Sequence, residues 1–531
     1  MSASPECTAA AEVASLLDHA RTHKGFHIAG ALEFRDGERG RGVFTKEGVT
    51  TSNALLLLVP QTLSIEPLPA LNELVRRGET SRLLALTLTM LHGLHEESKS
   101  ATYYALLKAS PLPDTPLLWS AQDLAQLEGT SLLRGRAGAG ADTAAAAAAA
   151  AAASCFELDV LPIMERAGDA AVPKASRTAT SFTTALAWVM SRAVLGRVAY
   201  EFDEPRLWPY LRPDGPATDT HLRLLPVFDC INTSPEPAAC NAKLVQPGSD
   251  LGGWEVRTLR PLKAGEEILI SYGHHGAAEL VRTYGVAPTG GAKAGAPSRS
   301  SAATGVNPNT DVNFSREEVL RAVRAALSRH GRHGGAAAGS EDDDSSGDVL
   351  SEADASARFA ALEGAGRLPV CFTVTSLLTA VPPMLLTAVQ VLLMDAEEYS
   401  EWEAAGCISL GVSFLDDASL PHVVGSLLSL VNARVHELGA GGDAAEARAG
   451  EAAPLAVRMG RGLRVEERQV LDALKRAVLS LEVADEDEEE ESEDESGSSV
   501  SEDEEEQDAA PAGAGAPPGH GGAGKRQRTG D

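Results

Sequence analysis

Two apolar segments that each run into polar residues constrain this chain more than any other part of it. The first, residues 225–231, leads into Asn232-Thr233-Ser234, and the second, residues 268–270, leads into Ser271-Tyr272-Gly273. Short apolar runs bounded by turn residues are typical of buried strands. We therefore predict two buried strands. A strand that only fills a core has no need of such polar ends, so the ends predict a functional site.

The neighbouring sequence predicts further strands and a helix. Residues 254–259 alternate large and charged side chains, which is the period of a half-buried strand, and Pro-Leu-Lys-Ala-Gly at 261–265 supplies a turn. Upstream, residues 9–22 have the apolar spacing of a helix, residues 26–34 predict a strand, and residues 55–59 predict another strand that ends at Pro60. The leucines at 83–91 are too dense for a solvent-facing helix and predict a buried one. Further on, Ser315 and Glu318 have the spacing of a capping box at the start of a helix, and a last helix is predicted at 466–481.

Taken together, the two segments resemble the C-terminal half of a SET methyltransferase domain. The pattern is Asp229-x-x-Asn232-x-Ser234 on the first and Gly-Glu-Glu-Ile-x-Ile-Ser-Tyr-Gly at 265–273 on the second, with Tyr284-Gly285 just beyond. The resemblance is to the split-SET enzymes of the Rubisco large-subunit lysine methyltransferase type. It implies an α+β fold, in which a β-rich SET domain is split by a helical insert and followed by an α-helical C-terminal domain.

Composition places the boundaries of these parts. Gly, Ala, Ser and Pro dominate after Pro288, which is typical of a linker, and a second polar stretch and an acidic C-terminal tail have the composition of disordered chain. An alanine tract at 144–153 has little to bury, so we place it in a surface loop. The predicted parts are an N-terminal helix (1–23), the SET domain (24–288, with its insert at about 68–220), a linker (289–307), a helical substrate-binding-like domain (308–481, disordered at 334–356) and a disordered acidic tail (482–531).

The resemblance implies S-adenosylmethionine as the cofactor and two groups of residues that contact it. Arg39, Gly40 and Arg41 lie in a Gly-x-Gly sequence, where a missing Cβ lets the backbone approach the cofactor closely; a simple hairpin turn is the alternative. Arg192, in Ser-Arg-Ala, corresponds to an arginine that can hold the methionine carboxylate through two hydrogen bonds. An ion pair on a helix surface is the alternative for Arg192.

Asn232 and Thr233 are the remaining residues expected to bind the cofactor. The resemblance implies that Asn232 hydrogen-bonds it and that the backbone of Thr233 contacts the adenine. Relatives usually have histidine at the position of Thr233. A main-chain contact survives this change, whereas packing by an imidazole ring does not.

Tyr272 is the predicted catalytic residue. By resemblance its hydroxyl lies where methyl group, sulfur and incoming nitrogen meet, and it also contacts the cofactor; a core tyrosine with a satisfied hydroxyl is the alternative. Asp229 is expected either to contact the substrate or to brace its strand. Tyr284 is expected to line the substrate channel or to stack near the cofactor; simple packing is the alternative.

These residues predict an S-adenosylmethionine-dependent protein-lysine methyltransferase that acts on a non-histone protein. Two alternatives stay open. Thr233 and the acidic tail favour a catalytically weak SET scaffold that binds basic proteins, and one branch of the same family methylates histidine.

Charge and composition limit the partners. The net charge is −29, and residues 481–510 alone carry 17 acidic and no basic side chains, so direct nucleic-acid binding is not expected. No apolar run has the length of a membrane span. Six scattered cysteines and the pair His274-His275 with His221 do not form a metal-binding pattern. We expect a monomer in the cytoplasm or nucleus, with the chloroplast left open because acidic residues near the start argue only against a typical transit peptide.

Overall fold

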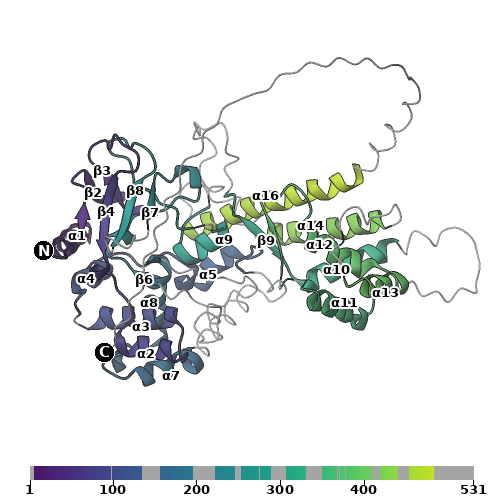
Figure 1. The fold of residues 1–531 in the computed structure, drawn as a ribbon, viewed down its shortest axis with the longest axis horizontal. Coiled ribbons are helices and arrows are strands. Elements are labelled where there is room, and N and C mark those ends of the chain that lie inside the picture. Colours follow the sequence, from purple (N-terminus) through teal and green to yellow (C-terminus); the bar gives the residue numbers. More distant parts are fainter. Residues whose placement is uncertain are drawn as a thin grey trace, which may run out of the picture. The chain divides into compact units, whose positions relative to one another are not determined.

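The computed structural model describes residues 5–96, 98–133, 156–194, 222–245, 253–273, 275–288, 307–330, 350–366, 369, 371–376, 378–407, 410, 419–440 and 454–483. The chain up to Ala484 forms one compact unit. It combines short sheets with many helices (Figure 1), so the predicted α+β class is confirmed. The alanine tract, nearly all of the predicted linker and the acidic tail from residue 484 on lie outside the described residues.

The largest sheet among the described residues has four antiparallel strands in the order β1-β4-β8-β7. Figure 1 labels three of them, β4, β8 and β7. The strands are β1 (His27–Ile28), β4 (Leu55–Pro60), β8 (Gly253–Thr258) and β7 (Ala242–Val245), and helix α1 (Pro5–Arg21) precedes them. β4 consists of four leucines, a valine and a proline and is buried along nearly its whole length. β8 is also mostly buried rather than half-buried as predicted, because its charged residue Glu255 pairs with Arg257 on the same strand.

A separate hairpin carries the Gly-x-Gly sequence. Strands β2 (Leu32–Gly37) and β3 (Gly40–Thr45) pair so that Gly37 lies opposite Gly40, which leaves two residues at the tip. The predicted strand at 26–34 is therefore two shorter strands, β1 and the start of β2, with a turn between them.

The prediction of two buried strands, at 225–231 and 268–270, is wrong, because neither segment forms a regular strand. Strand β6 (Arg223–Leu224), which pairs with β5 (Ala193–Val194), ends before the first segment. Pro226 has no N–H to donate and Val227 has a φ of +75°, so the chain turns there and continues as a short 3₁₀-helix, Phe228–Cys230. The second segment makes only single bridges, from Glu267 to Phe44, from Leu269 to Asn232 and from Ile270 to Ala242. Both segments are buried, but not as a continuous ladder.

Helices dominate the described part of the predicted insert. α3 (Arg82–His95) is buried along most of its length and packs against α8 (Ala179–Arg192), as the density of its leucines predicted. Ser81 and Thr178 cap these two helices at their N-termini. The other helices of the insert are α2 (Pro69–Arg76), α4 (Ala101–Ala109), α5 (Ala121–Leu124) and α7 (Leu161–Ala167), with 3₁₀- or π-helical turns at Pro116–Leu118, Ala125–Leu127, Phe156–Val160 and Lys174–Ser176. A further 3₁₀ turn, Gln61–Leu63, precedes the insert.

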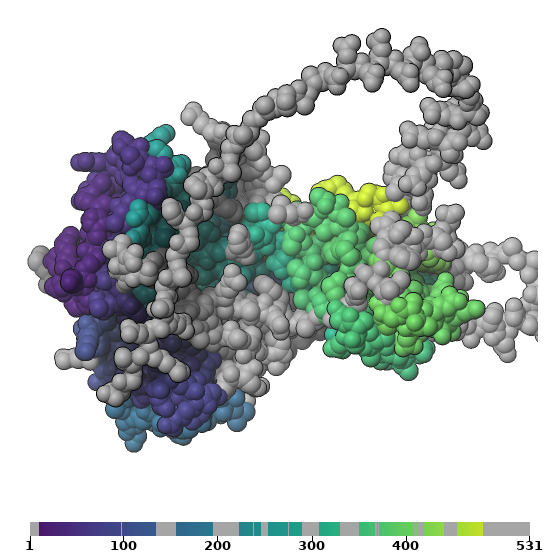
Figure 2. Space-filling view, in the orientation of Figure 1, coloured from purple at the N-terminus to yellow at the C-terminus, as the bar shows by residue number. Residues whose placement is uncertain are grey.

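A second apolar core lies inside the C-terminal part of the unit. This part is coloured green to yellow in Figure 2. Its elements are β9 (Asp311–Phe314), α10 (Arg316–His330), α11 (Glu352–Gly364), β10 (Phe372–Thr375), α12 (Pro383–Leu393), α13 (Ala396–Ala404), α14 (Leu420–Ala440) and α16 (Leu455–Val483). The predicted capping box of Ser315 and Glu318 is present at the start of α10. This part was predicted to be entirely helical, so the antiparallel strand pair β9–β10 was not predicted.

Two predicted details of this part are wrong. α11 begins at Glu352, inside the stretch predicted as disordered at 334–356, because Ser351 caps the helix by accepting a hydrogen bond from the Asp354 N–H. The final helix begins at Leu455 rather than Glu466. Its first turns pack Met459 and Leu463 against α9 (Ala277–Glu279) and the π-helical turn Leu280–Tyr284, which follow the Tyr272 segment.

Neither a membrane-spanning helix nor a metal cluster emerges from the described residues. Within them, no helix is both long and apolar enough to cross a bilayer. The same residues hold no group of three or more histidine, cysteine or acidic side chains placed to bind a metal. His221 and His274 lie outside the described residues.

Candidate active site

The segment at 266–272 gathers the predicted site residues because it passes between separate parts of the chain. Glu267 bridges to Phe44 of β3, and the Leu269 bridge to Asn232 is accompanied by a hydrogen bond from the Ile270 N–H to the Asn232 carbonyl of 3.0 Å. Asn241, only 1% exposed, fixes the segment further: its amide donates to the Glu267 carbonyl, and its side-chain oxygen accepts from the Leu269 N–H. The hairpin β2–β3, the Asn232 turn and the Tyr272 segment thus meet at one place.

Tyr272 points toward the Asn232 turn. Its hydroxyl donates a 2.7 Å hydrogen bond to the carbonyl of Ile231, and its ring lies 4.7 Å from that of Tyr284, centroid to centroid. Burial raises the pKa of the Tyr272 hydroxyl above its ordinary value; nearby Arg192 lowers it, while Asp229 adds to the rise. The hydroxyl is therefore a neutral donor at physiological pH.

Glu267 links two of the residues predicted to bind the cofactor, Asn232 and Arg39. The Asn232 amide donates to a Glu267 carboxylate oxygen at 2.9 Å and to the Arg41 carbonyl at 3.1 Å. Arg39 pairs with the other oxygen of Glu267 at 3.1 Å. The Arg41 side chain turns instead to the Ser110 hydroxyl on the insert, 3.1 Å away. Glu267 stands in the Gly-Glu-Glu motif, but its bridging role was not predicted.

The two glycines of Gly-x-Gly have different structural roles. Gly40 has a φ of +84° at the hairpin tip, and a Cβ there would meet no atom within 4 Å among the described residues. A Cβ on Gly42 would lie 2.6 Å from a Glu267 carboxylate oxygen and 3.0 Å from the Asn232 amide nitrogen. Gly40 is thus needed for the turn, and the close approach occurs at Gly42.

The crowding at Gly42 gives a first prediction. Replacing Gly42 with alanine is expected to lower the free energy of unfolding by about 1–3 kcal/mol, because the new Cβ displaces Glu267 and Asn232 and strains the hydrogen bonds that hold them to each other, to Arg39 and to the Arg41 carbonyl. Urea unfolding measures the change. Gly30→Ala is the matched control: a Cβ on exposed Gly30 meets nothing within 4 Å, and we expect a change within about 0.5 kcal/mol. Equal midpoints for Gly42→Ala and the unmodified protein would contradict the crowding.

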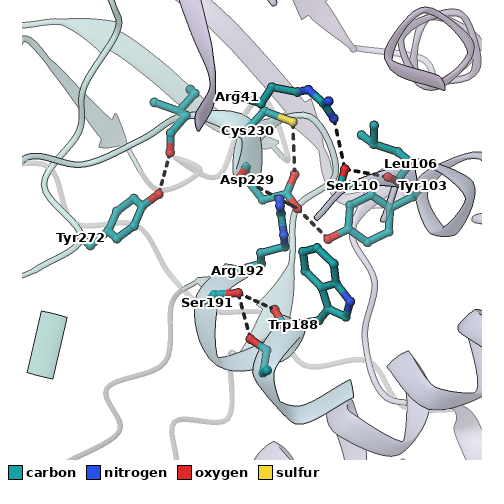
Figure 3. A network of polar contacts seen from close by, with 12 residues as sticks. Arg41, Tyr103, Leu106, Ser110, Trp188, Ser191, Arg192, Asp229, Cys230 and Tyr272 are labelled. Atoms are coloured by element: carbon teal, nitrogen blue, oxygen red, sulfur yellow. Dashed lines mark hydrogen bonds and ion pairs between the residues drawn. The ribbon is translucent and has the colours of Figure 1, made fainter. Parts of the chain in front are cut away.

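A buried ion pair holds Arg192 (Figure 3). One nitrogen of its guanidinium donates to the Asp229 carboxylate and to the Asp229 carbonyl, each at 3.1 Å, and the Tyr103 hydroxyl donates to the same carboxylate oxygen at 2.6 Å. The Asp229 side chain is 0% exposed. Burial lowers the pKa of Arg192 and the Asp229 carboxylate raises it, and the net change is a rise. Of the two roles left open for Asp229, these contacts support bracing.

Arg192 keeps part of its donor capacity. Its Nε is buried and has no hydrogen-bond partner among the described residues, and its guanidinium lies 4.8 Å from the Trp188 ring centroid. Tyr103 reaches this pair from α4 of the insert, across 126 residues of sequence. Nothing in the sequence around Tyr103 predicts this contact.

A small pocket opens beside Tyr272. Thr233, the residue that replaces the usual histidine, contributes to its wall and is only 3% exposed. The lining residues are Thr233, Ser234, Pro235, Ser271, Tyr272, Gly273, His275, Leu280, Asn307 and Asn309. The pocket therefore includes residues from both motif segments and from the start of the C-terminal helical part.

No protein-family model matches the sequence, and no curated protein matches it. Solved structures do match. The chain is similar to the SET domain of LSMT bound to lysine and AdoHcy, with a TM-score of 0.55, 16% identity and coverage of 89% of this chain and 92% of that chain. It is similar, with the same TM-score and coverage, to Rubisco LSMT bound to AdoMet (15% identity) and to Rubisco LSMT bound to sinefungin and monomethyllysine (14% identity). This likeness establishes the fold: the chain has a SET fold of the Rubisco LSMT type, as its two motif segments predicted.

Proposed function

We propose that this chain is an S-adenosylmethionine-dependent protein methyltransferase that modifies a lysine side chain of a non-histone protein. One observation supports this most: within a SET fold, the hydroxyl of Tyr272 is a neutral donor directed at the end of the Asn232 turn, 2.7 Å from the Ile231 carbonyl. A tyrosine that only filled the core would not need Arg192, Asp229 and Glu267 close enough to act on the pKa of its hydroxyl.

The residues around Tyr272 fit an amino-acid cofactor. S-adenosylmethionine carries a carboxylate and an ammonium group. Arg192 has a buried Nε with no partner among the described residues, and a guanidinium is the side chain best suited to a carboxylate. Glu267 and the Asn232 side chain offer acceptor oxygens suited to the ammonium group. We assign cofactor binding to Arg192, Asn232, the Thr233 backbone and the hairpin residues Arg39 to Arg41.

The chain's own groups would then orient the reaction. The bound cofactor would supply an electrophilic methyl group on a sulfonium. Methyl transfer needs the two reactants in line, so holding them is most of the catalytic task. Tyr272 would orient the incoming amine and stabilise the charge that develops as the transfer proceeds. Tyr284, packed against Tyr272, would keep that ring in place and form a wall for the substrate side chain.

Lysine is the proposed target because the neighbouring structures are bound to lysine or methylated lysine. A lysine amine must lose its proton before it can attack, and an apolar channel beside a cationic sulfonium favours that loss. The acidic tail in the sequence favours a basic protein partner. A radiolabelled methyl group transferred in a cell extract, followed by mass spectrometry of the labelled protein, distinguishes lysine from histidine and identifies the substrate.

Binding of the cofactor is the most direct test of this function. Titration calorimetry with S-adenosylmethionine is expected to show one site per chain. Arg192→Lys keeps the charge beside Asp229 but loses the planar guanidinium, so the affinity should fall by about tenfold, the value of one charge-assisted hydrogen bond.

The control for Arg192→Lys is Arg177→Lys, which changes another largely buried arginine paired with an aspartate, Asp169, away from the site. Its affinity should match that of the unmodified protein. If the unmodified protein shows no heat of binding with S-adenosylmethionine, the scaffold alternative is favoured. In that alternative the cofactor site has been lost and threonine stands at position 233 in place of histidine.

A further inference from the structure

Three contacts fix His275, and one of them holds the backbone of Tyr272. Its Nε2 lies 3.0 Å from the Tyr272 carbonyl oxygen, and its Nδ1 lies 2.7 Å from a Glu279 carboxylate oxygen. Its own carbonyl accepts a 2.9 Å hydrogen bond from the Asn307 amide. Because a carbonyl oxygen can only accept, Nε2 must carry the proton in the contact with Tyr272.

The packing around the His275 ring leaves little freedom. Gly273 has a φ of +132°, and a Cβ there would lie 2.9 Å from the His275 Nε2, so the ring occupies the space that any other residue would need. The His275 and Tyr284 rings lie 5.6 Å apart, and Tyr284 in turn packs against Tyr272. The imidazole therefore supports Tyr272 twice, through its backbone and through the neighbouring ring.

The groups that fix His275 connect it to the C-terminal helical part. Asn307 is 1% exposed, and its carbonyl accepts from the Ser376 hydroxyl, just after β10. Glu279 is 5% exposed and ends α9, which packs against the first turns of α16. The position of the imidazole thus depends on elements outside the SET core.

We propose that His275 is the positioning residue that sets the place of Tyr272 in the reaction and links it to the C-terminal helical part through Glu279 and Asn307. This inference rests on the proposed function, because it assigns His275 a role in the turnover carried by Tyr272. His275 acts through Tyr272 and makes no bond to the reacting atoms. Its loss should therefore change kcat far more than the binding of either reactant.

Two substitutions separate positioning from mere packing. His275→Phe keeps a planar ring but removes both ring nitrogens, including the Nε2–H donor. We expect kcat to fall by about tenfold, less than the loss that a displacement of 1 Å can produce. KM for the substrate and the affinity for S-adenosylmethionine should stay within about twofold. His275→Gln restores an N–H that can reach the Tyr272 carbonyl, so kcat should recover to within about threefold of the unmodified enzyme.

His95→Phe is the matched control, because His95 is exposed at the end of α3. It should leave kcat unchanged. Each of three results would overturn the positioning role. The first is an unchanged kcat in His275→Phe, and the second is a change confined to KM. The third is a His275→Gln variant that does not recover kcat although both variants melt at the temperature of the unmodified protein.

A readout independent of turnover keeps the two proposals apart. In long-range ¹H–¹⁵N spectra of ¹⁵N-histidine-labelled protein, the His275 signals, assigned by their loss in His275→Gln, should show a proton on Nε2. Glu279→Gln should shift the Nδ1 signal. An unprotonated Nε2 would overturn the inference even in an active enzyme. If the protein neither binds the cofactor nor transfers methyl groups, the proposed function is wrong even when Nε2 carries the proton. His275 would then have no role in turnover, and its contact with Tyr272 would be structural only.

Discussion

Tyr272→Phe is expected to lower kcat for methyl transfer by about a hundredfold to a thousandfold, which is the usual cost of removing one hydrogen-bond donor aimed at a developing charge. The substitution removes a single oxygen atom. The phenylalanine ring can still pack against Tyr284 at the observed 4.7 Å, so the wall of the pocket should be preserved. The affinity for S-adenosylmethionine should change by no more than about twofold, because the loss is confined to the transition state.

The stability of the Tyr272→Phe protein serves as an internal check. The hydroxyl donates only one hydrogen bond within the described residues, to the Ile231 carbonyl, and its loss should cost about 1 kcal/mol of unfolding free energy. Single-turnover measurements with radiolabelled cofactor would follow the chemical step. Tyr399→Phe, on α13 in the second core, is the matched control and should keep full activity. Labelling at the unmodified rate in Tyr272→Phe would remove this tyrosine from the mechanism.

Local sequence patterns predicted the fold where the structure depends on neighbouring residues. The leucines of α3 predicted a buried helix, and Ser315 with Glu318 predicted the start of α10, because both signals lie within a few residues of the structure that they specify. Residues 225–231 were wrongly predicted to form a strand because only their local composition was considered. Their apolar composition required burial, but a buried turn with Val227 at positive φ satisfies that requirement as well as a strand does.

The candidate site depended on contacts that no local pattern contains. The resemblance named Asn232, Arg192 and Tyr272, and the structure places the first two against Glu267 and Asp229. These two pairings were not predicted. The Asn232–Glu267 contact is fixed by how the segment at 266–272 passes between β3 and the Asn232 turn, and Arg192 meets Asp229 across 37 residues of sequence. The Tyr103 contact with Asp229 was the hardest to predict, because Tyr103 belongs to the helical insert and lies 126 residues away in the sequence. The roles of these residues in binding and catalysis stay predictions until the variants are measured.

Asp229→Asn should destabilise the folded chain by about 3–5 kcal/mol, because it leaves the Arg192 guanidinium buried without its counter-ion. That is a large part of the 5–15 kcal/mol that is typical of a folded domain. The Asp229 side chain is 0% exposed, whereas Arg192 is 21% exposed, so the carboxylate is the more deeply buried partner. Burial and the Asp229 carboxylate together raise the pKa of the Tyr103 hydroxyl well above its ordinary value, so this hydroxyl donates to Asp229 as a neutral group.

Urea unfolding followed by circular dichroism measures the effect of Asp229→Asn. The control is Asp18→Asn, which breaks the exposed pair with Arg21 on α1, where the side chains are 74% and 58% exposed, and should change stability by less than about 1 kcal/mol. Asp229→Asn combined with Arg192→Met removes both charges and should recover part of the lost stability, since the main cost of the single change is the unpaired cation. Cofactor affinity should not recover in the double variant, because the guanidinium proposed to hold the carboxylate is gone. A double variant less stable than Asp229→Asn would show instead that Arg192 stabilises the fold through contacts other than this ion pair.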